Sequence, residues 1–256
     1  MIGMTDLSAF PITKRWPPQH PDRLQLYSLT TPNGVKISIA LEEMGLAYEP
    51  HYIDFGTEDQ KTPEFRSLNP YAKIPAIIDP NGPGGKPLPL FESGAILLYL
   101  AEKTGTFLPG PGLKARGEML SWLMFVASGI GPYSGQAVHF KTYAPKPNDY
   151  AVARYTFEAE RHWGIVDAHL GKHRYMCGDT YTIVDMALWG WSRLTPFVLG
   201  QDVAAKLTNV QRHLAEISAR PAAVRALALK DRYTFKTEMD DTARIAMFPH
   251  LAKKVA

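Results

Sequence analysis

The chain has 256 residues, of which 45% are hydrophobic, so it can bury a substantial core as one large domain or two small ones. Its 28 basic residues nearly cancel its 25 acidic residues, which leaves a net charge of +3 and no dense run of lysine and arginine. This balance argues against a role on nucleic acid or on a membrane surface.

Cysteine content and apolar stretches indicate the compartment. The single cysteine, Cys177, excludes an internal disulfide framework and fits a reducing environment. No apolar stretch approaches the roughly 18 residues of a membrane-spanning helix, and the first twenty residues contain none of the signal-peptide type. We therefore expect a cytoplasmic protein without membrane contacts.

The first half of the chain alternates predicted strands and helices. Residues 1–23 contain four prolines and predict an arm that lies over the surface rather than a folded unit. Residues 24–29 alternate apolar and polar as a strand does, and a helical pattern follows the turn at 31–34. The further predicted elements are a strand at 48–55, a short helix at 63–68, strands at 74–79 and 88–91, and a helix at 93–103. The order is βαβ followed by ββα, in a domain that covers 24–103.

The second half is predicted to be helical. Residues 104–112 contain three glycines and two prolines, which favour an interdomain linker. Helical periodicity then dominates an all-α domain at 113–233, and the tail at 234–256 carries little periodicity. The predicted helices of this domain are 114–135, 148–171, 182–199 and 203–218.

The turn Thr31-Pro32-Asn33-Gly34 is the first candidate site. Its hydroxyl, amide and backbone N–H groups surround the positive end of the predicted helix, which favours an anion. A free thiol has a pKa of about 8.5, and such surroundings lower it, so a thiol bound here would be partly thiolate at neutral pH. Because the turn contains no cysteine, the sulfur would come from a ligand. The alternative is a simple helix cap by Thr31, with Pro32 at the first helical position.

Pro75 opens a predicted strand and is the second candidate feature. Proline is disfavoured in a sheet except at an edge, at a bulge or in a cis bond. A cis Ile74-Pro75 bond would turn the N–H and C=O of Ile74 outward, where they could pair with an extended ligand. The alternative is a proline in an edge strand.

The third candidate, Phe91-Glu92-Ser93-Gly94, joins a predicted strand to a predicted helix, with Ser93 expected at the N-cap. The hydroxyl, the helix N–H groups and the nearby carboxylate suit a ligand amino acid that bears both carboxylate and ammonium. A cap without ligand-binding function is again the alternative.

Together these motifs resemble the cytosolic glutathione transferases. The resemblance rests on the β-turn-α start, on Asn69-Pro70-Tyr71-Ala72-Lys73-Ile74-Pro75-Ala76, on Phe91-Glu92-Ser93-Gly94-Ala95-Ile96-Leu97-Leu98-Tyr99-Leu100 and on the helical second half. It covers residues 24 to about 230 and implies a thioredoxin-like α/β domain followed by an all-α helical domain. The turn at 31–34 and Gly131-Pro132-Tyr133-Ser134-Gly135-Gln136 narrow it to the Nu class, the bacterial glutathione-dependent disulfide-bond oxidoreductases.

The resemblance also implies roles for individual residues. Thr31 and Asn33 would hydrogen-bond the sulfur of glutathione. The remaining implied contacts are Gln60 and Lys73 at the glycine end, the Ile74 backbone at the cysteinyl part, Glu92 and Ser93 at the γ-glutamyl end, and the cation of Arg154. No metal is implied.

Three residues compete with this assignment. Many other glutathione transferases use a Tyr, Ser or Cys near the first turn, and Tyr27 or Ser28 could be mistaken for that group. Their distance from the predicted helix start favours Thr31 and Asn33. Thr30 stays open as a substitute for Thr31, since it is the neighbouring residue.

Other residues are interpreted as structural. Thr182-Ile183-Val184-Asp185 has the spacing of a reciprocal capping box. His169 and His173 are expected to face solvent rather than a metal, and Cys177 to be a half-buried small side chain. The resemblance places a second-substrate wall near an aromatic group whose members we expect to be mostly core or subunit interface: Trp122, Phe125, Tyr133, Phe140 and Tyr143.

The sequence therefore predicts a glutathione-dependent disulfide-bond reductase of the glutathione transferase type. Conjugation of glutathione to electrophiles or reduction of peroxides is an alternative main activity. A glutathione-binding regulatory protein with little turnover is an alternative of another class. The resemblance further implies a homodimer, with the first domain of one subunit against the helical domain of the other.

Overall fold

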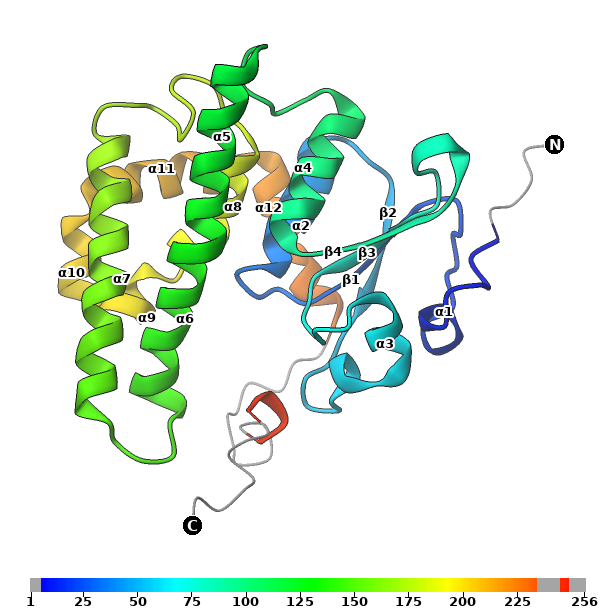
Figure 1. Ribbon diagram of the computed structural model, residues 1–256, viewed down its shortest axis with the longest axis horizontal. Coiled ribbons are helices and arrows are strands. Elements are labelled where there is room, and N and C mark those ends of the chain that lie inside the picture. The colour runs from blue at the N-terminus through cyan, green and yellow to red at the C-terminus, as the bar shows by residue number, and fades with distance from the viewer. Residues whose placement is uncertain (1–5, 234–244, 249–256) are drawn as a thin grey trace. The chain divides into compact units, whose positions relative to one another are not determined.

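The structure, a computed structural model, describes residues 6–233 and 245–248, and the chain divides into two compact units (Figure 1). The first unit runs up to Ile96 and resumes at Ala226, and the second extends from Leu97 to Arg225. Most of the predicted tail at 234–256 lies outside the described residues.

A four-stranded sheet forms the centre of the first unit (Figure 1). The strand order is β2-β1-β3-β4, with β1 parallel to β2 and antiparallel pairing elsewhere. This is the thioredoxin-like arrangement that the resemblance implied, and it agrees with the predicted order of βαβ followed by ββα. The strands are β1 Leu24–Ser28, β2 Tyr48–Tyr52, β3 Ala76–Asp79 and β4 Leu88–Phe91.

Helices follow the strands at the predicted places. The Thr62 hydroxyl accepts the backbone N–H of Phe65 at 3.3 Å and so caps α3, with Pro63 at the first position of that helix. The helices near the sheet in sequence are α1 Ile12–Arg15, α2 Gly34–Glu43, α3 Pro63–Leu68 and α4 Ser93–Thr104, with short 3₁₀ turns η1 Asp59–Lys61 and η2 Pro83–Gly85. Much later in the chain come α12 Pro221–Ala228 and the 3₁₀ turn η5 Leu229–Arg232.

The N-terminal arm is more than a surface segment. Its residues Leu7 and Ile12 are buried in the core of the first unit, where they pack with Phe65 of α3 and Tyr27 of β1. The short helix α1 lies beside α3 (Figure 1). The expectation of an arm without folded structure was wrong because two isolated apolar residues among prolines show no periodicity.

The second unit is helical, as predicted, but its first helix is longer and less regular. The predicted helix 114–135 continues to Tyr143 and contains two π-helical segments, η3 Val126–Ile130 and η4 His139–Tyr143. The predicted helix 182–199 breaks after Ser192, where Pro196 begins a new turn. The α-helices are α5 Leu113–Phe125, α6 Gly131–Val138, α7 Asp149–Leu170, α8 Ile183–Ser192, α9 Thr195–Leu199, α10 Gln201–Lys206 and α11 Thr208–Ser218.

The predicted capping box at the start of α8 is present. The Thr182 N–H donates to Asp185 Oδ2 at 2.8 Å, while the Thr182 hydroxyl accepts the N–H of Val184 at 3.3 Å. The other carboxylate oxygen of Asp185 accepts the Met176 N–H at 2.8 Å and lies 2.9 Å from Nε2 of His213. Because Asp185 and His213 are fully buried, this network holds three segments of the helical unit together.

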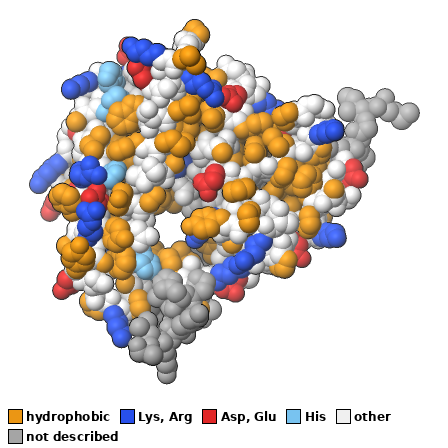
Figure 2. All heavy atoms as spheres, viewed as in Figure 1, with side chains coloured by type: hydrophobic (Ala, Val, Ile, Leu, Met, Phe, Trp, Pro, Cys, Tyr) orange, Lys and Arg blue, Asp and Glu red, His pale blue; other side chains and the backbone are white. Residues whose placement is uncertain are grey.

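The surface carries charges of both signs among hydrophobic and uncharged side chains, as the face drawn in Figure 2 shows. No helix within residues 6–233 and 245–248 is long and apolar enough to cross a bilayer. Among the same residues, no group of three or more His, Cys, Asp or Glu side chains is arranged to hold a metal ion.

Candidate functional site

The register of the sheet brings the three predicted motifs to one edge. Tyr27 of β1 pairs with Ala76 of β3, and Ala76 pairs with Phe91 of β4. The end of β1, the start of β3 and the end of β4 therefore lie side by side. As a result, three features lie together where these strands begin or end, which we call the sheet edge: the turn at 31–34, the Ile74-Pro75 bond and Glu92.

The turn after β1 has the geometry of a helix cap. Thr31 Oγ1 accepts the N–H of Gly34 at 3.2 Å, and the Thr31 carbonyl accepts the N–H of Val35 at 3.0 Å. Because α2 begins at Gly34 with Asn33 at the N-cap, Pro32 is not at the first helical position, but the Thr31 hydroxyl does accept the first N–H of the helix. The hydroxyl still has one hydrogen that it can donate. The hydrogen can be donated to a sulfur at the positive end of α2.

Gly34 is required where β1 passes into α2. A Cβ atom at this position would lie 1.8 Å from the Leu29 carbonyl oxygen and 2.6 Å from the Ser28 hydroxyl oxygen. The carbonyl belongs to the backbone and cannot move without displacing the strand. The lack of space for a Cβ atom is therefore sufficient to explain why position 34 holds glycine.

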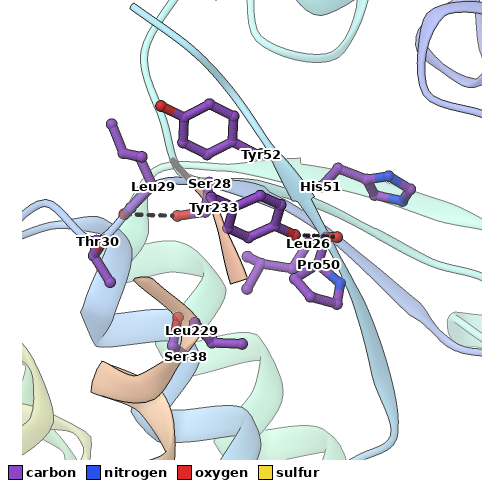
Figure 3. Close-up of a pocket in the computed structure, with 10 residues that line it drawn as sticks. All are labelled: Leu26, Ser28, Leu29, Thr30, Ser38, Pro50, His51, Tyr52, Leu229 and Tyr233. Carbon is purple, nitrogen blue, oxygen red and sulfur yellow. Dashed lines mark hydrogen bonds between the residues drawn. The ribbon is translucent and has the colours of Figure 1, made fainter. Parts of the chain in front are cut away.

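The competing residues have other surroundings. Tyr27 is fully buried, its ring stacks on His51 with centroids 4.6 Å apart, and burial raises the pKa of its phenol. The Ser28 hydroxyl donates to the Leu29 carbonyl at 3.3 Å. Ser28 and Thr30 line a pocket with Leu229 and Tyr233 that Thr31 does not line (Figure 3). These positions favour Thr31 over all three as the hydroxyl at the helix end.

The chain that follows α12 contributes Leu229 and Tyr233 to the lining of the pocket in Figure 3. The Tyr233 hydroxyl donates to the carbonyl of Pro50 in β2 at 3.0 Å, and the Tyr233 ring stacks on Tyr52 with centroids 4.9 Å apart. Tyr233 therefore anchors the chain after α12 to β2, the edge strand of the sheet.

The loop before β3 presents Lys73 and Ile74. The Asn69 side chain, only 1% exposed, donates to the Lys73 carbonyl at 2.6 Å and accepts the Tyr71 N–H at 3.0 Å. The Ile74-Pro75 peptide bond is cis. Because β3 lies between β1 and β4, the alternative of an edge-strand proline was wrong.

Gln60 and Lys73 line one pocket of about 260 Å³. Gln60 is buried, and its Oε1 has no hydrogen-bond partner within the described part of the chain. A buried amide oxygen without a partner is costly unless a ligand or water satisfies it. The sequence analysis missed the two cations Lys61 and Arg66, which line the same pocket and carry no distinguishing motif.

Glu92 and Ser93 occupy the start of α4. The helix begins at Ser93, and the Glu92 carbonyl accepts the N–H of Ile96 at 2.9 Å, so Glu92 rather than Ser93 is at the N-cap. Glu92 has a φ of 69°, a value uncommon for a residue with a side chain. The Glu92 side chain is exposed and Ser93 is half-buried, so both can reach a ligand at this helix end.

Lys36 is an unexpected charged residue in the first turn of α2. It is only 3% exposed, and burial lowers its pKa from 10.5 to about 7, although the negative charge of Glu92 partly opposes the shift. A cation is also disfavoured near a helix N-terminus. The single clue in the sequence was a charged residue within the run from Val35 to Leu41, whose other residues are apolar except for Ser38.

Arg154 lies on α7 in the helical unit, whereas the other predicted contacts belong to the first unit. Its guanidinium forms an ion pair of 2.5 Å with the Glu158 carboxylate, which also accepts Nε of Arg161 at 3.0 Å. These hydrogen bonds lower the pKa of Glu158, with that from Arg161 contributing most. The carboxylate holds Arg154 in place on the helix surface.

The predicted aromatic group packs within the helical unit. Phe125 and Tyr133 flank the ring of His162, at 5.2 Å and 4.7 Å between centroids, and Phe140 stacks on Tyr155. Trp122 packs against His169, whose Nε2 lies 3.1 Å from the Met176 carbonyl. His169 is thus half-buried, and the expectation that it faces solvent was wrong.

Cys177 is partly buried, and burial raises the pKa of its thiol. The Thr182 hydroxyl donates to its sulfur at 3.5 Å. A thiol in this state is a poor nucleophile, so the protein supplies no activated sulfur of its own.

A thioredoxin-like sheet with a capped helix at the strand edge, followed by a helical unit, defines a protein of the glutathione transferase type. Residues 22–102 match the family model "Glutathione S-transferase, N-terminal domain". The chain is 42% identical over 237 residues to disulfide-bond oxidoreductase YghU of Escherichia coli K12, with 87% of this chain and 78% of YghU covered. The chain belongs to the glutathione transferase family of enzymes.

Solved structures of glutathione transferases are also similar to this chain. A glutathione transferase from Burkholderia graminis, with two glutathione molecules bound per subunit, is 53% identical with a TM-score of 0.86; 91% of this chain and 99% of that one are covered. A glutathione transferase from Pseudomonas putida, with one glutathione disulfide per subunit, is 49% identical with a TM-score of 0.83; 88% of this chain and all of that one are covered.

We expect Gly34→Ala to destabilise the protein by about 3 kcal/mol or more, because the new Cβ meets the Leu29 carbonyl. Gly164→Ala is a matched control: this glycine lies within α7, and a Cβ there meets nothing within 4 Å. The control should gain roughly 0.5–1 kcal/mol. Urea unfolding measures both changes, and equal stability of the two variants would contradict the close-approach argument.

We expect Lys36→Met to stabilise the protein at pH 6 by on the order of a few kcal/mol, since it removes a buried cation. Between pH 7 and 10.5 the unfolded chain binds more protons at Lys36 than the folded chain, so wild-type stability should rise with pH there. The variant should lack this rise.

Urea unfolding at pH 6 and pH 9 measures the difference. Lys114→Met, at a side chain that is 92% exposed, should leave stability nearly unchanged at both pH values. A Lys36→Met variant that is equally destabilised at the two pH values would refute the argument.

Proposed function

We propose that this chain reduces disulfides with glutathione, which it binds as a thiolate at the Thr31 turn. The observation that carries the proposal is a hydroxyl at the positive end of α2, on a sheet edge without any cysteine. The Pseudomonas putida relative with bound glutathione disulfide supports the same chemistry.

Thr31 and Asn33 would lower the pKa of the bound thiol. A hydroxyl or amide hydrogen donated to sulfur stabilises the thiolate more than the thiol. The N-terminus of α2 adds its positive dipole end in the same direction. More thiolate at neutral pH means faster attack on a disulfide, because the thiolate is the nucleophile.

Two glutathione molecules complete the reaction. The first thiolate attacks one sulfur of the substrate disulfide, forms a mixed disulfide with it and releases the other half as a thiolate. The second glutathione thiolate attacks the glutathione sulfur of the mixed disulfide, releasing the remaining substrate thiolate and glutathione disulfide. The Burkholderia graminis relative, with two glutathione molecules per subunit, supports room for both.

The rest of the glutathione peptide would lie along the strand edge. Lys73 offers a cation to the terminal carboxylate at the glycine end, and the unsatisfied Gln60 Oε1 is an acceptor for the N–H of that glycine. The Ile74 backbone would pair with the cysteinyl part. Glu92 and Ser93 would hold the γ-glutamyl end, where a carboxylate faces ammonium and helix N–H groups face carboxylate. We also assign a cationic contact with glutathione to Arg154.

We expect the double variant Thr31→Val/Asn33→Ala to lose disulfide reduction by about 10- to 100-fold at pH 7. Without the two donors the bound thiol should titrate closer to its free pKa of about 8.5, so the rising limb of the pH–rate profile should move to higher pH. Steady-state rates with glutathione and a small disulfide from pH 5.5 to 9.5 test this. Thr30→Val is the matched control, and a double variant with the wild-type rate and profile would overturn the assignment.

We further propose a homodimer. Large hydrophobic side chains are exposed on both units, including Tyr71 and Phe91 in the first and Tyr150 and Phe157 in the second. Sedimentation velocity at micromolar concentration should give a species of twice 28.5 kDa. A single species of 28.5 kDa would contradict the dimer.

A further inference from the structure

The N-terminal arm holds a cation against the loop that carries Gln60. Arg15 Nη2 at the end of α1 lies 2.6 Å from Asp59 Oδ1, across 44 residues of sequence. The arginine side chain is 42% exposed, whereas that of the aspartate is only 10% exposed. The buried carboxylate therefore depends on this cation far more than the cation depends on the carboxylate.

Asp59 in turn organises its loop through several bonds. Its Oδ2 accepts the N–H of Asp54 at 3.0 Å, and its own N–H donates to the Asp54 carbonyl at 3.0 Å. Its carbonyl accepts the Thr62 hydroxyl at 2.8 Å and the Thr62 N–H at 3.2 Å. Asp59 thus ties together both ends of the segment from Asp54 to the cap of α3.

Gln60 follows Asp59 directly and shares its rigid backbone. It is buried in the pocket that Lys73 also lines, with its Oε1 unsatisfied in the described part of the chain. A side chain placed this way binds well only if the backbone beneath it stays fixed, because a displacement of about 1 Å disrupts a hydrogen bond.

We propose that Arg15 is a positioning residue for glutathione, which acts through Asp59 to hold Gln60 against the glycine end of the tripeptide. This inference rests on the proposed function and extends it to the arm. Arg15 sets affinity for the glycine end, while the reacting sulfur at Thr31 is outside its influence.

The test compares glutathione with γ-glutamylcysteine, the same molecule without glycine. In Arg15→Gln, the dissociation constant for glutathione should rise about tenfold, while that for γ-glutamylcysteine stays within about twofold. In disulfide reduction, KM for glutathione should rise with kcat nearly unchanged. Calorimetry, steady-state kinetics and a thermal melt of each variant supply these readouts.

Further variants make the test specific. Arg15→Lys keeps a cation and should restore most of the affinity. Asp59→Asn should reproduce the loss, and the double variant Arg15→Gln/Asp59→Asn should be no worse than either single change. In a Gln60→Ala background, Arg15→Gln should have no further effect. The exposed Arg23 of the same arm supplies the control Arg23→Ala, which should bind both ligands as the wild type does.

The outcomes separate the two proposals. A wild-type chain that binds no glutathione would overturn the proposed function and this inference with it. If the wild type binds glutathione but Arg15→Gln and Asp59→Asn weaken both ligands equally, or neither, the positioning role is refuted while the proposed function stands. An Arg15→Gln effect that persists in the Gln60→Ala background would also refute it.

Discussion

The contact between Gly34 and the Leu29 carbonyl determines how α2 leaves β1, and the arrangement of the site depends on it. With no Cβ in the way, the helix can begin directly against the strand end, so that its first N–H groups point along the sheet edge. The register of β1, β3 and β4 then adds Ile74 and Glu92 to the same edge. A wider turn would separate the helix terminus from the other two motifs.

Several features of this edge reduce stability rather than increase it. Lys36 is a cation in a buried helix turn, the Gln60 amide oxygen lacks a partner in the described chain, and Glu92 and Ala72 have positive φ values. Each feature costs on the order of 1 kcal/mol or more. Several destabilising residues close together are expected at a binding site, where the residues serve a ligand rather than the stability of the fold.

The fold was predictable where its signals are local. The strand at Leu24–Ser28, the turn at 31–34 and the capping box at Thr182 were each predicted from a few neighbouring residues, and all three are present in the structure, although the strand is buried on both faces rather than on one. The ion pair between Arg15 and Asp59 was not predictable, because it joins residues 44 positions apart that carry no shared pattern. The burial of Lys36 depends likewise on tertiary packing, which periodicity in a single helix does not reveal.

Two π-helical segments flank α6 and affect which face of that helix turns toward α7. This face carries residues of the motif Gly131-Pro132-Tyr133-Ser134-Gly135-Gln136. A π-helical turn accommodates one residue more than an α-helical turn, and one residue corresponds to about 100° of rotation in an α-helix. With η3 preceding α6, the ring of Tyr133 lies 4.7 Å from that of His162 in α7, measured between centroids. Length changes of a single residue within Val126–Ile130 would therefore turn a different face of α6 toward α7, so this segment tolerates substitutions more readily than insertions or deletions.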